Sequence, residues 1–265
     1  MTFNVFGVNS ISLEGQNFAK RDHMTILDNL KLVNERIKKS CATSGVDMSK
    51  IKILAVSKKM GTNKILEAHE AGLNLFGENY ISESIEKINY FKKIGLNFEW
   101  HYIGPIQSNK TKSIAENFDW VHSVSTPKTV KRLIAQRPIA LGPINIFVQI
   151  NISNEKNKSG TKVDELRPIL KECTEFGRIK VRGLMTIPEN TSDNELIKKR
   201  FHSLVDTQRK LRLDFAIQNP TVFIFDMISM GMSSDMELAI SESDPSFTTL
   251  VRLGTSIFGK RPRTA

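Results

Sequence analysis

The sequence predicts an α/β protein built as a single (β/α)8 barrel, a TIM-like fold, with one added helix at its N-terminal end. Short apolar runs that suit strands alternate with stretches of helical periodicity, in eight strand-then-helix steps if the segment after Leu253 is counted. The runs "INIFVQIN" and "TVFIFDMI" are nearly all apolar, as parallel strands covered on both faces are. An open doubly wound sheet is the alternative, but the chain has no glycine fingerprint of the dinucleotide type.

The first predicted element is a helix over residues 24–45, where apolar residues recur near helical spacing and a glycine offers a stop. The predicted strands are 51–57, 73–76, 98–103, 120–124, 144–151, 181–187, 221–228 and 249–253. The predicted helices between them are one within "TNKILEAHEAG", capped by Thr62 or Asn63 and closed by Gly72, and then 80–93, 108–117, 127–136, 163–176, 194–213 and 234–240. We expect one barrel domain over residues 23–265, with residues 1–22 as a loosely held extension.

Length and composition favour a soluble globular protein. The 265 residues are 40% hydrophobic and 25% charged, and no apolar run approaches the roughly 20 residues that cross a membrane. Cys41 and Cys173 lie far apart in the sequence, which predicts free thiols in a reducing compartment. The first residues lack the basic and apolar regions of a secretory signal. We therefore expect a cytoplasmic protein without a membrane segment.

The net charge of +10 has two interpretations. It can attract nucleic acid or smaller anionic ligands, or it can reflect lysines on solvated helix faces. The basic residues are dispersed, and aromatic residues are not interleaved with them as base-stacking platforms require. We therefore expect no nucleic-acid partner.

A barrel places its functional residues at the carboxyl ends of its strands. The first predicted strand ends at Ser57, and Lys58 and Lys59 follow. Burial at the barrel mouth would lower the pKa of a lysine ammonium, and the neutral amine can form a Schiff base with an aldehyde. A surface lysine is the alternative. Because both faces of this strand are apolar, its alternation does not separate Lys58 from Lys59.

Two donor-rich turns follow the last two strands, in "SMGMSSDMELAI" (229–240) and "VRLGTSIFG" (251–259). Barrels often bind phosphate at these two strand ends, through backbone N–H groups. The residues predicted to approach such an anion are Gly231, Ser233, Gly254 and Thr255. Ser234 and Glu237 fit a capping box for the helix that follows. Ordinary turn chemistry is the alternative.

Arg252 lies within the apolar last strand, two residues before Gly254 and on the same strand face. A buried arginine needs a partner. One interpretation is a structural ion pair with Glu78, and the other is a cation that faces a ring nitrogen or a phosphate. His101 is interpreted as a hydrogen-bonded core histidine, with an acid–base group as the alternative. No His or Cys pair has metal-ligand spacing, so we expect no structural metal.

A Schiff-base lysine and a phosphate cup together describe a site for pyridoxal 5′-phosphate (PLP). The chain resembles the pyridoxal phosphate homeostasis proteins of the YggS/PROSC type from about residue 50 to 260. The stretches that carry the resemblance are "ILAVSKK", "FGENYISESIEK", "WHYIGPIQSNK", "VHSV", "VQINISNEKNKSG", "RGLMTIP", "SMGMSSDMELAI" and "VRLGTSIFG". The chain departs from the family pattern in "KMGT" after Lys58, in "HSVST" and in its N-terminal extension.

The resemblance implies a barrel like the N-terminal domain of alanine racemase. It implies Lys58 as the Schiff-base lysine and Asn79 near the cofactor. It places Ser233, Gly254 and Thr255 around the phosphate, and Arg252 at either the ring nitrogen or the phosphate.

The resemblance also favours a carrier or buffer of PLP that acts in vitamin B6 and amino-acid homeostasis. A PLP-dependent racemase or lyase of low activity is the main alternative, and an aldolase that uses Lys58 without PLP is another. A barrel-type racemase takes its second acid–base group from a β-rich domain of a partner, and only six residues follow the predicted barrel. Because racemase-like dimer contacts would need that second domain, we expect a monomer. A carrier function implies transient contacts to PLP-dependent apo-enzymes.

Overall fold

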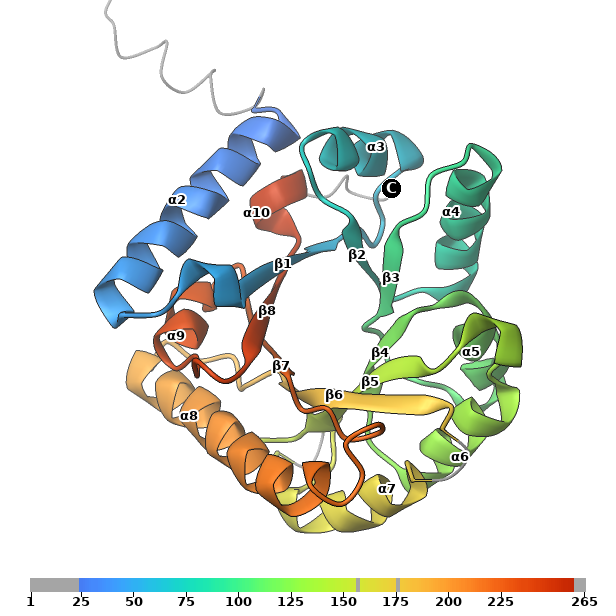
Figure 1. The fold of residues 1–265 in the computed structure, drawn as a ribbon. Helices are drawn as coiled ribbons and strands as arrows, with labels where there is room; N and C mark the ends of the chain where they lie inside the picture. Colours follow the sequence, from blue (N-terminus) through green and yellow to red (C-terminus); the bar gives the residue numbers. More distant parts are fainter. Residues whose placement is uncertain (1–23, 156–157, 175–176, 260–265) are drawn as a thin grey trace, which may run out of the picture.

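The computed structural model describes residues 24–155, 158–174 and 177–259. Its eight parallel strands close into a barrel in sequential order, β1 pairing with both β2 and β8 (Figure 1). The predicted (β/α)8 barrel is therefore confirmed. The expected extension over residues 1–22 and the last residues of the expected domain lie outside the described residues.

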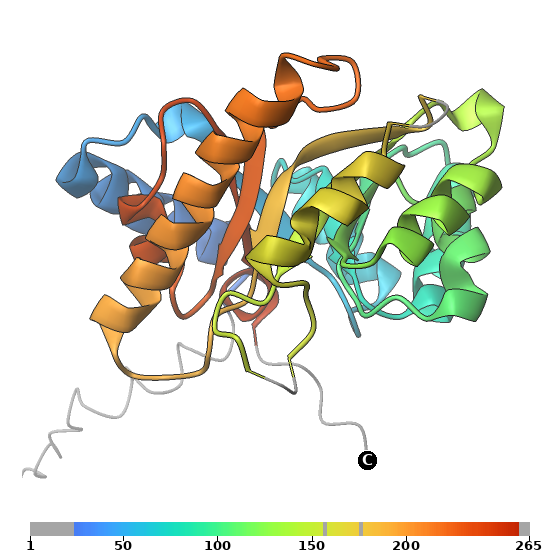
Figure 2. The same ribbon diagram turned by 90° about the horizontal axis from the view of Figure 1, so that it is seen from below.

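The helices surround the strands, and the loops after β5 and β6 lie at one end of the barrel (Figure 2). The strands are β1 Ile51–Val56, β2 Leu75–Glu78, β3 Glu99–Tyr102, β4 Trp120–Val124, β5 Ile144–Ile150, β6 Ile179–Thr186, β7 Met227–Met232 and β8 Thr248–Leu253. The α-helices are α2 Ile26–Ser44, α3 Thr62–Glu70, α4 Ile81–Lys93, α5 Thr111–Asn117, α6 Pro127–Gln136, α7 Leu166–Glu172, α8 Asn194–Leu211, α9 Met236–Ser241 and α10 Thr255–Phe258. Short 3-10 segments are Met48–Lys50, Ser108–Lys110, Ile139–Leu141 and Val163–Glu165, and a π segment, Arg212–Ala216, continues α8.

The added helix α2 lies outside the barrel against α9 and α10 (Figure 1). Its first turn is capped by Thr25, whose side chain accepts from the backbone N–H of Asp28. Gly45 closes it in the left-handed conformation that favours glycine, with φ 67°. This helix begins and ends close to where its sequence pattern predicts.

The seventh strand was predicted too early in the chain, over residues 221–228. Phe223 makes only an isolated bridge to Val181, and Phe225 has a left-handed backbone with φ 45°. That turn interrupts the extended chain, so regular pairing begins only at Met227. The residues "SMGM" are consequently the end of strand β7, and the loop begins at Ser233.

The N-terminal caps predicted for α9 and α3 are wrong, whereas Gly72, with φ 100°, follows the end of α3 as predicted. Helix α9 begins at Met236 after Asp235, whose carboxylate accepts from the backbone N–H of Met232 at 2.6 Å. Glu237, the expected partner of Ser234 in a capping box, instead accepts from Arg36 on α2 at 2.7 Å. Helix α3 likewise begins at Thr62 itself and has no side-chain cap. On α9 the expected capping residue Glu237 instead binds a residue distant in sequence, and on α3 the cap position is taken by Gly61, which has no side chain to form the bond.

The barrel interior divides into an apolar part and a polar part. A small cluster fills the apolar part: Leu54, Trp120, Phe147, Met185, Met227 and Leu250. His101, His122 and Ser229 are completely buried alongside it. The larger core lies between the strands and the surrounding helices. The interior is therefore closed below the strand ends, and a ligand can enter only at the mouth.

Candidate functional site

A cavity of about 390 Å³ opens at the carboxyl ends of the strands. Its polar or glycine lining residues are Lys58, Asn79, Ser233, Ser234, Arg252, Gly254 and Thr255, and its apolar ones are Val56, Ile103, Met185, Ile187 and Met232. Six of the seven residues predicted from the sequence thus surround one cavity. They come from strands that are widely separated in the chain, as the barrel topology requires.

The structure distinguishes the two neighbouring lysines. Lys58 is half-buried and lines the cavity, whereas Lys59 is exposed. Lys59 has a positive φ of 62°, and its ammonium lies 5.9 Å from the centre of the Tyr80 ring. The loop between β1 and α3 therefore turns between the two residues, and of the two only Lys58 borders the cavity.

A buried lysine on helix α4, Lys87, anchors the backbone on both sides of Lys58. Its ammonium donates to the carbonyl oxygen of Ser57 at 2.9 Å and to Glu78 at 2.8 Å. It also pairs with Glu83, whose carboxylate accepts from the backbone N–H of Lys59 at 2.6 Å. Lys87 is only 5% exposed.

Glu78 completes this anchor from strand β2. Its Oε1 accepts from the hydroxyl of Ser57 at 2.6 Å as well as from Lys87. Burial raises the pKa of Glu78, although both donors favour its charged form. Lys87 was not among the residues predicted for the site. The available signal was its position on the same helix face as Ser84, Ile88 and Phe91, where a charged residue needs a buried partner.

The rim on the opposite side of the cavity is formed by the loops after β7 and β8. Ser233 follows β7, and Gly254 and Thr255 follow β8. In α10 the N–H groups of Ile257 and Phe258 donate to the carbonyl oxygen of Gly254 at 3.0 and 2.9 Å, so the first-turn donors that the helix itself does not use are those of Thr255 and Ser256. The sequence prediction of donors at both strand ends agrees with this arrangement.

Gly231 is the predicted site residue that does not line the cavity. Its φ is 86°, and a Cβ at this position would lie 2.7 Å from the Cβ of Ala239. The missing side chain thus lets helix α9 pack closely against strand β7. Any approach of Gly231 to a phosphate stays a prediction.

Helix α2 supports this rim from outside. Arg36 donates from Nε to Glu237 on α9 at 2.7 Å and from a terminal nitrogen to the carbonyl oxygen of Ser233 at 3.3 Å. Asn29 donates to the carbonyl oxygen of Ile257 on α10 at 2.9 Å. The added helix therefore touches the segments behind both rim loops.

Arg252 forms part of the cavity floor. It is 5% exposed and donates to the hydroxyl of Ser229 at 2.7 Å and to the carbonyl oxygen of Thr186 at 2.8 Å. Burial lowers its pKa to about 10, and the charge of Asp235 opposes this shift, so Arg252 remains cationic at neutral pH. The suggested ion pair with Glu78 is wrong, because Glu78 is bound to Lys87 and Ser57.

Asn79 contributes an unsatisfied polar atom to the cavity. Its Oδ1 is buried and has no hydrogen-bond partner among the described residues. Gly104 lies so close to the Asn79 backbone that a Cβ there would be 2.4 Å from the Asn79 carbonyl oxygen. A buried acceptor without a donor costs free energy, so the geometry favours a ligand that supplies one.

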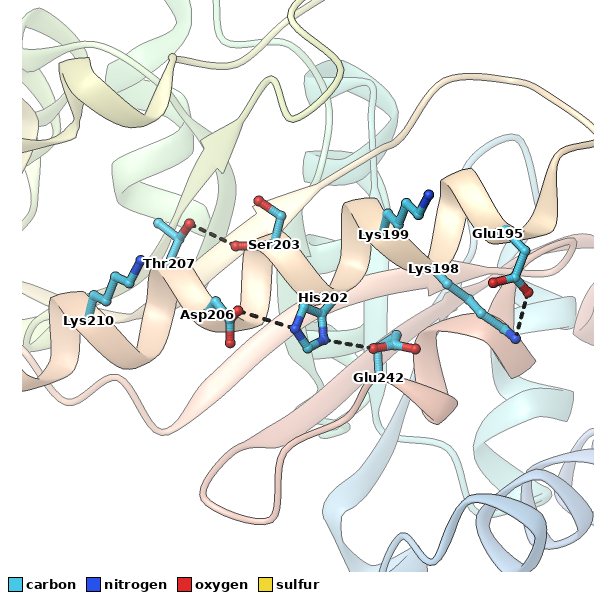
Figure 3. Close-up of a pocket in the computed structure, with 9 residues that line it drawn as sticks. All are labelled: Glu195, Lys198, Lys199, His202, Ser203, Asp206, Thr207, Lys210 and Glu242. Atoms are coloured by element: carbon cyan, nitrogen blue, oxygen red, sulfur yellow. Dashed lines mark hydrogen bonds and ion pairs between the residues drawn. The ribbon is translucent and has the colours of Figure 1, made fainter.

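A second hollow, of about 550 Å³, lies along the outer side of helix α8 (Figure 3). His202 is its central side chain and contacts Asp206 at 3.2 Å and Glu242 at 3.1 Å. A further ion pair joins Lys198 and Glu195 on the same exposed surface, and no residue at a strand end lines the hollow. The groups expected at a barrel active site are therefore at the mouth instead.

The described part of the chain, residues 24–155, 158–174 and 177–259, holds no group of three or more His, Cys, Asp or Glu side chains arranged to bind a metal ion. It also contains no helix long and apolar enough to span a membrane.

Comparison with known proteins places the chain in a family. The family model described as "Alanine racemase, N-terminal domain" matches residues 27–262. The pyridoxal phosphate homeostasis protein of Haemophilus influenzae is 40% identical over 238 residues, 90% of this chain and 97% of that protein. Its counterpart in Escherichia coli is 39% identical over 237 residues, 89% of this chain and 97% of that protein.

The chain belongs to the pyridoxal phosphate homeostasis protein family. The family resemblance seen in the sequence motifs is thus confirmed. The structure of a further family member, PipY of Synechococcus elongatus with PLP bound, superposes with a TM-score of 0.70 at 29% identity, covering 86% of this chain and all of that one. The family match includes all eight strands and helix α2, so the cavity lies within the shared fold.

Proposed function

We propose that this chain binds PLP in the cavity at the barrel mouth, holds it as a Schiff base on Lys58, and acts as an intracellular carrier or buffer in PLP and amino-acid homeostasis. The observation that carries the proposal is the common cavity of Lys58 and the two donor-rich rim loops. An amine at one side and anion donors at the other match an aldehyde and a phosphate on one small molecule.

The other lining residues fit the same molecule. The apolar side chains Val56, Ile103 and Met185 provide a surface for the faces of an aromatic ring. The unpaired Asn79 Oδ1 can accept a hydrogen bond from a hydroxyl group on that ring. PLP, when bound, supplies an aldehyde that condenses with the lysine amine, forming one C=N bond and releasing one water.

We assign Arg252 to the ring rather than to the phosphate. Its guanidinium is bound to Ser229 and Thr186 on the cavity floor, whereas the phosphate donors belong to the loops at the rim. A cation beside a pyridine nitrogen keeps that nitrogen unprotonated and weakens the ring as an electron sink. This supports a carrier. The likeness to the racemase domain is the observation that favours the alternative, a racemase or lyase of low activity.

The proposal is tested with purified protein and PLP. We expect a visible absorbance band on addition of PLP, and after borohydride reduction a single labelled peptide modified at Lys58. A protein that stays colourless with excess PLP would overturn the proposal, and a label at Lys59 would overturn the assignment. Rapid conversion of single-enantiomer amino acids would favour the racemase alternative.

The carrier function includes delivery to PLP-dependent apo-enzymes by transient contact, from a monomer in the cytoplasm. A mixture of the PLP-loaded protein with a PLP-dependent apo-enzyme should gain enzyme activity faster than apo-enzyme with the same concentration of free PLP. Light scattering should give the mass of one 30.0 kDa chain.

A further inference from the structure

A continuous line of hydrogen bonds crosses the barrel interior and ends on Arg252. Its members, hereafter the interior chain, are Glu99, His101, His122, Ser229 and Arg252. The consecutive distances are 2.9 Å from Glu99 Oε1 to His101 Nε2, 2.9 Å from His101 Nδ1 to His122 Nε2, 3.0 Å from His122 Nδ1 to Ser229 Oγ, and 2.7 Å from Ser229 Oγ to Arg252. Glu99 is the first residue of β3, whereas Arg252 lies at the cavity.

The chemistry of the two ends fixes the direction of every bond. A guanidinium has donors only, so Arg252 donates to the Ser229 oxygen. At the other end the Glu99 carboxylate only accepts, so His101 donates to it from Nε2–H, and the Nδ1 of this neutral ring accepts from His122 Nε2–H. A neutral His122 is then the Nε2–H tautomer, and its Nδ1 accepts from the Ser229 hydroxyl.

His101 is therefore also the neutral Nε2–H tautomer, and it donates to Glu99. A carboxylate accepts without donating, so the chain ends there consistently. Burial lowers the pKa of both histidines, that of His122 furthest, which agrees with two neutral rings. Reversal of these bonds would require a protonated Glu99 that donates to His101 Nε2. Burial raises the pKa of Glu99, but the hydrogen bond from His101 and the charges of Lys52 and Arg182 outweigh burial and lower the pKa, so Glu99 is the acceptor.

The two rings are also held mechanically. His101 stacks on Trp120 with ring centres 5.1 Å apart and an interplanar angle of 9°. His122 packs against Phe147 with ring centres 4.6 Å apart. Both histidines and Ser229 are completely buried, so water does not compete for their hydrogen bonds.

We propose that the interior chain positions the guanidinium of Arg252 at the cavity floor. His101, His122 and Ser229 are then positioning residues for the cofactor site, although none of them lines the cavity. The four aligned hydrogen bonds stabilise the buried cation because the negative ends of their dipoles face it, while its remaining donors can face the ligand. This inference rests on the proposed function only for the identity of that ligand.

The direction of the chain is tested without PLP. Long-range ¹H–¹⁵N NMR of the purified protein reports the tautomer of each of its five histidines. We expect neutral Nε2–H signals for His101 and His122 at pH 7. A neutral Nδ1–H tautomer or a charged ring at either position would overturn the proposal.

The link to the cofactor site is tested with Ser229→Ala, which removes one of the two acceptors of Arg252 and leaves the carbonyl oxygen of Thr186. We expect the His122 signals to shift and the dissociation constant for PLP to rise about tenfold, since a hydrogen bond to a charged group is lost. Ser243→Ala is the matched control. It removes a half-buried hydroxyl that forms a hydrogen bond with Thr249, and neither residue belongs to the interior chain. It should leave both measurements unchanged.

A shifted His122 signal with unchanged PLP affinity would overturn the positioning role. If Ser229→Ala does not fold, His122→Asn serves in its place, because it also breaks the chain next to Ser229, with the same expected loss of affinity. A wild-type protein that binds no PLP but shows both predicted tautomers would refute the proposed function and leave the direction of the chain intact.

Discussion

The ammonium group of Lys87 lies 2.9 Å from the carbonyl oxygen of Ser57, the residue immediately before Lys58. Through Glu83 it is also linked to the backbone N–H of Lys59, the residue immediately after. One buried cation on α4 thus connects both neighbours of the proposed Schiff-base lysine. The position of Lys58 at the cavity therefore depends on how α4 packs against the ends of β1 and β2.

Replacement of Lys87 by methionine should destabilise the fold and loosen the loop between β1 and α3, which carries Lys58 and Lys59. It keeps most of the side-chain length but leaves Glu78 buried without its cation, which should cost about 3–5 kcal/mol of unfolding free energy. Urea denaturation measures this loss. The double variant Lys87→Met/Glu78→Gln removes the uncompensated charge and should recover most of the stability.

The same double variant separates positioning from stability. Because Ser57 and Lys59 would still lack their anchor, we expect borohydride to trap PLP on Lys58 more slowly than in the wild type. Trapping at the wild-type rate in a well-folded double variant would show that Lys87 has a structural role alone.

The two adjacent lysines should behave differently. Lys58→Ala is expected to abolish the visible band with PLP and the borohydride label, because the only lysine that lines the cavity among the described residues is gone. Lys59→Ala is the matched control and should keep both, since Lys59 is exposed and lies over Tyr80. A band of equal intensity in Lys58→Ala would contradict the assignment.

Helix α2 should influence PLP binding from outside the barrel. Arg36→Ala removes the contacts to Glu237 and the Ser233 carbonyl, and for a half-exposed ion pair we expect a loss of about 0.5–1 kcal/mol. If the rim loop moves, the dissociation constant for PLP should rise about two- to fivefold.

The control for Arg36 is Arg167→Ala, which removes another exposed arginine–carboxylate pair, with Asp214 on the π segment that continues α8. It should not change PLP affinity. Equal affinities in the two variants, measured by fluorescence titration, would show that α2 does not support the phosphate rim.

The alternation of apolar runs and helical periods was enough to predict the barrel, because each unit must bury a strand between helices whatever its neighbours are. It also located the pair Lys58 and Lys59 and the rim residues, since the ends of parallel strands meet at one end of a barrel, but only the family resemblance separated the two lysines. The start of β7 was missed because Phe225 turns the chain within an apolar run. Nothing in its local sequence marks that turn.

The contacts that organise the site depend on packing rather than on local pattern. Lys87 reaches Ser57 only through the placement of α4, and Arg36 reaches Glu237 only because α2 lies beside α9. The interior chain depends on the relative register of four strands, which a single sequence does not specify. For these reasons Arg252 could be identified as unusual from the sequence, but its partner could not.

The interior chain also predicts how stability depends on pH. Burial lowers the pKa of His101 and lowers that of His122 well below the ordinary value of 6.5. Below pH 6.5 the unfolded chain therefore takes up protons that the folded protein does not, and its unfolding free energy falls as the pH falls. Each neutral histidine contributes a slope of up to about 1.4 kcal/mol per pH unit.

Comparison of His122→Asn with the wild type isolates this contribution, because the carboxylates titrate in both proteins. Between pH 6.5 and 5 the variant should lose stability less steeply, by up to about 1.4 kcal/mol per pH unit, in urea denaturation at each pH. His202→Asn removes a histidine from the exposed face of α8 and is the matched control for the substitution itself. If both variants follow the wild-type curve, His122 is protonated in the folded protein. The hydroxyl of Ser229 would then have no acceptor at His122 Nδ1, and the one-way order of the hydrogen bonds that lead to Arg252 would be lost.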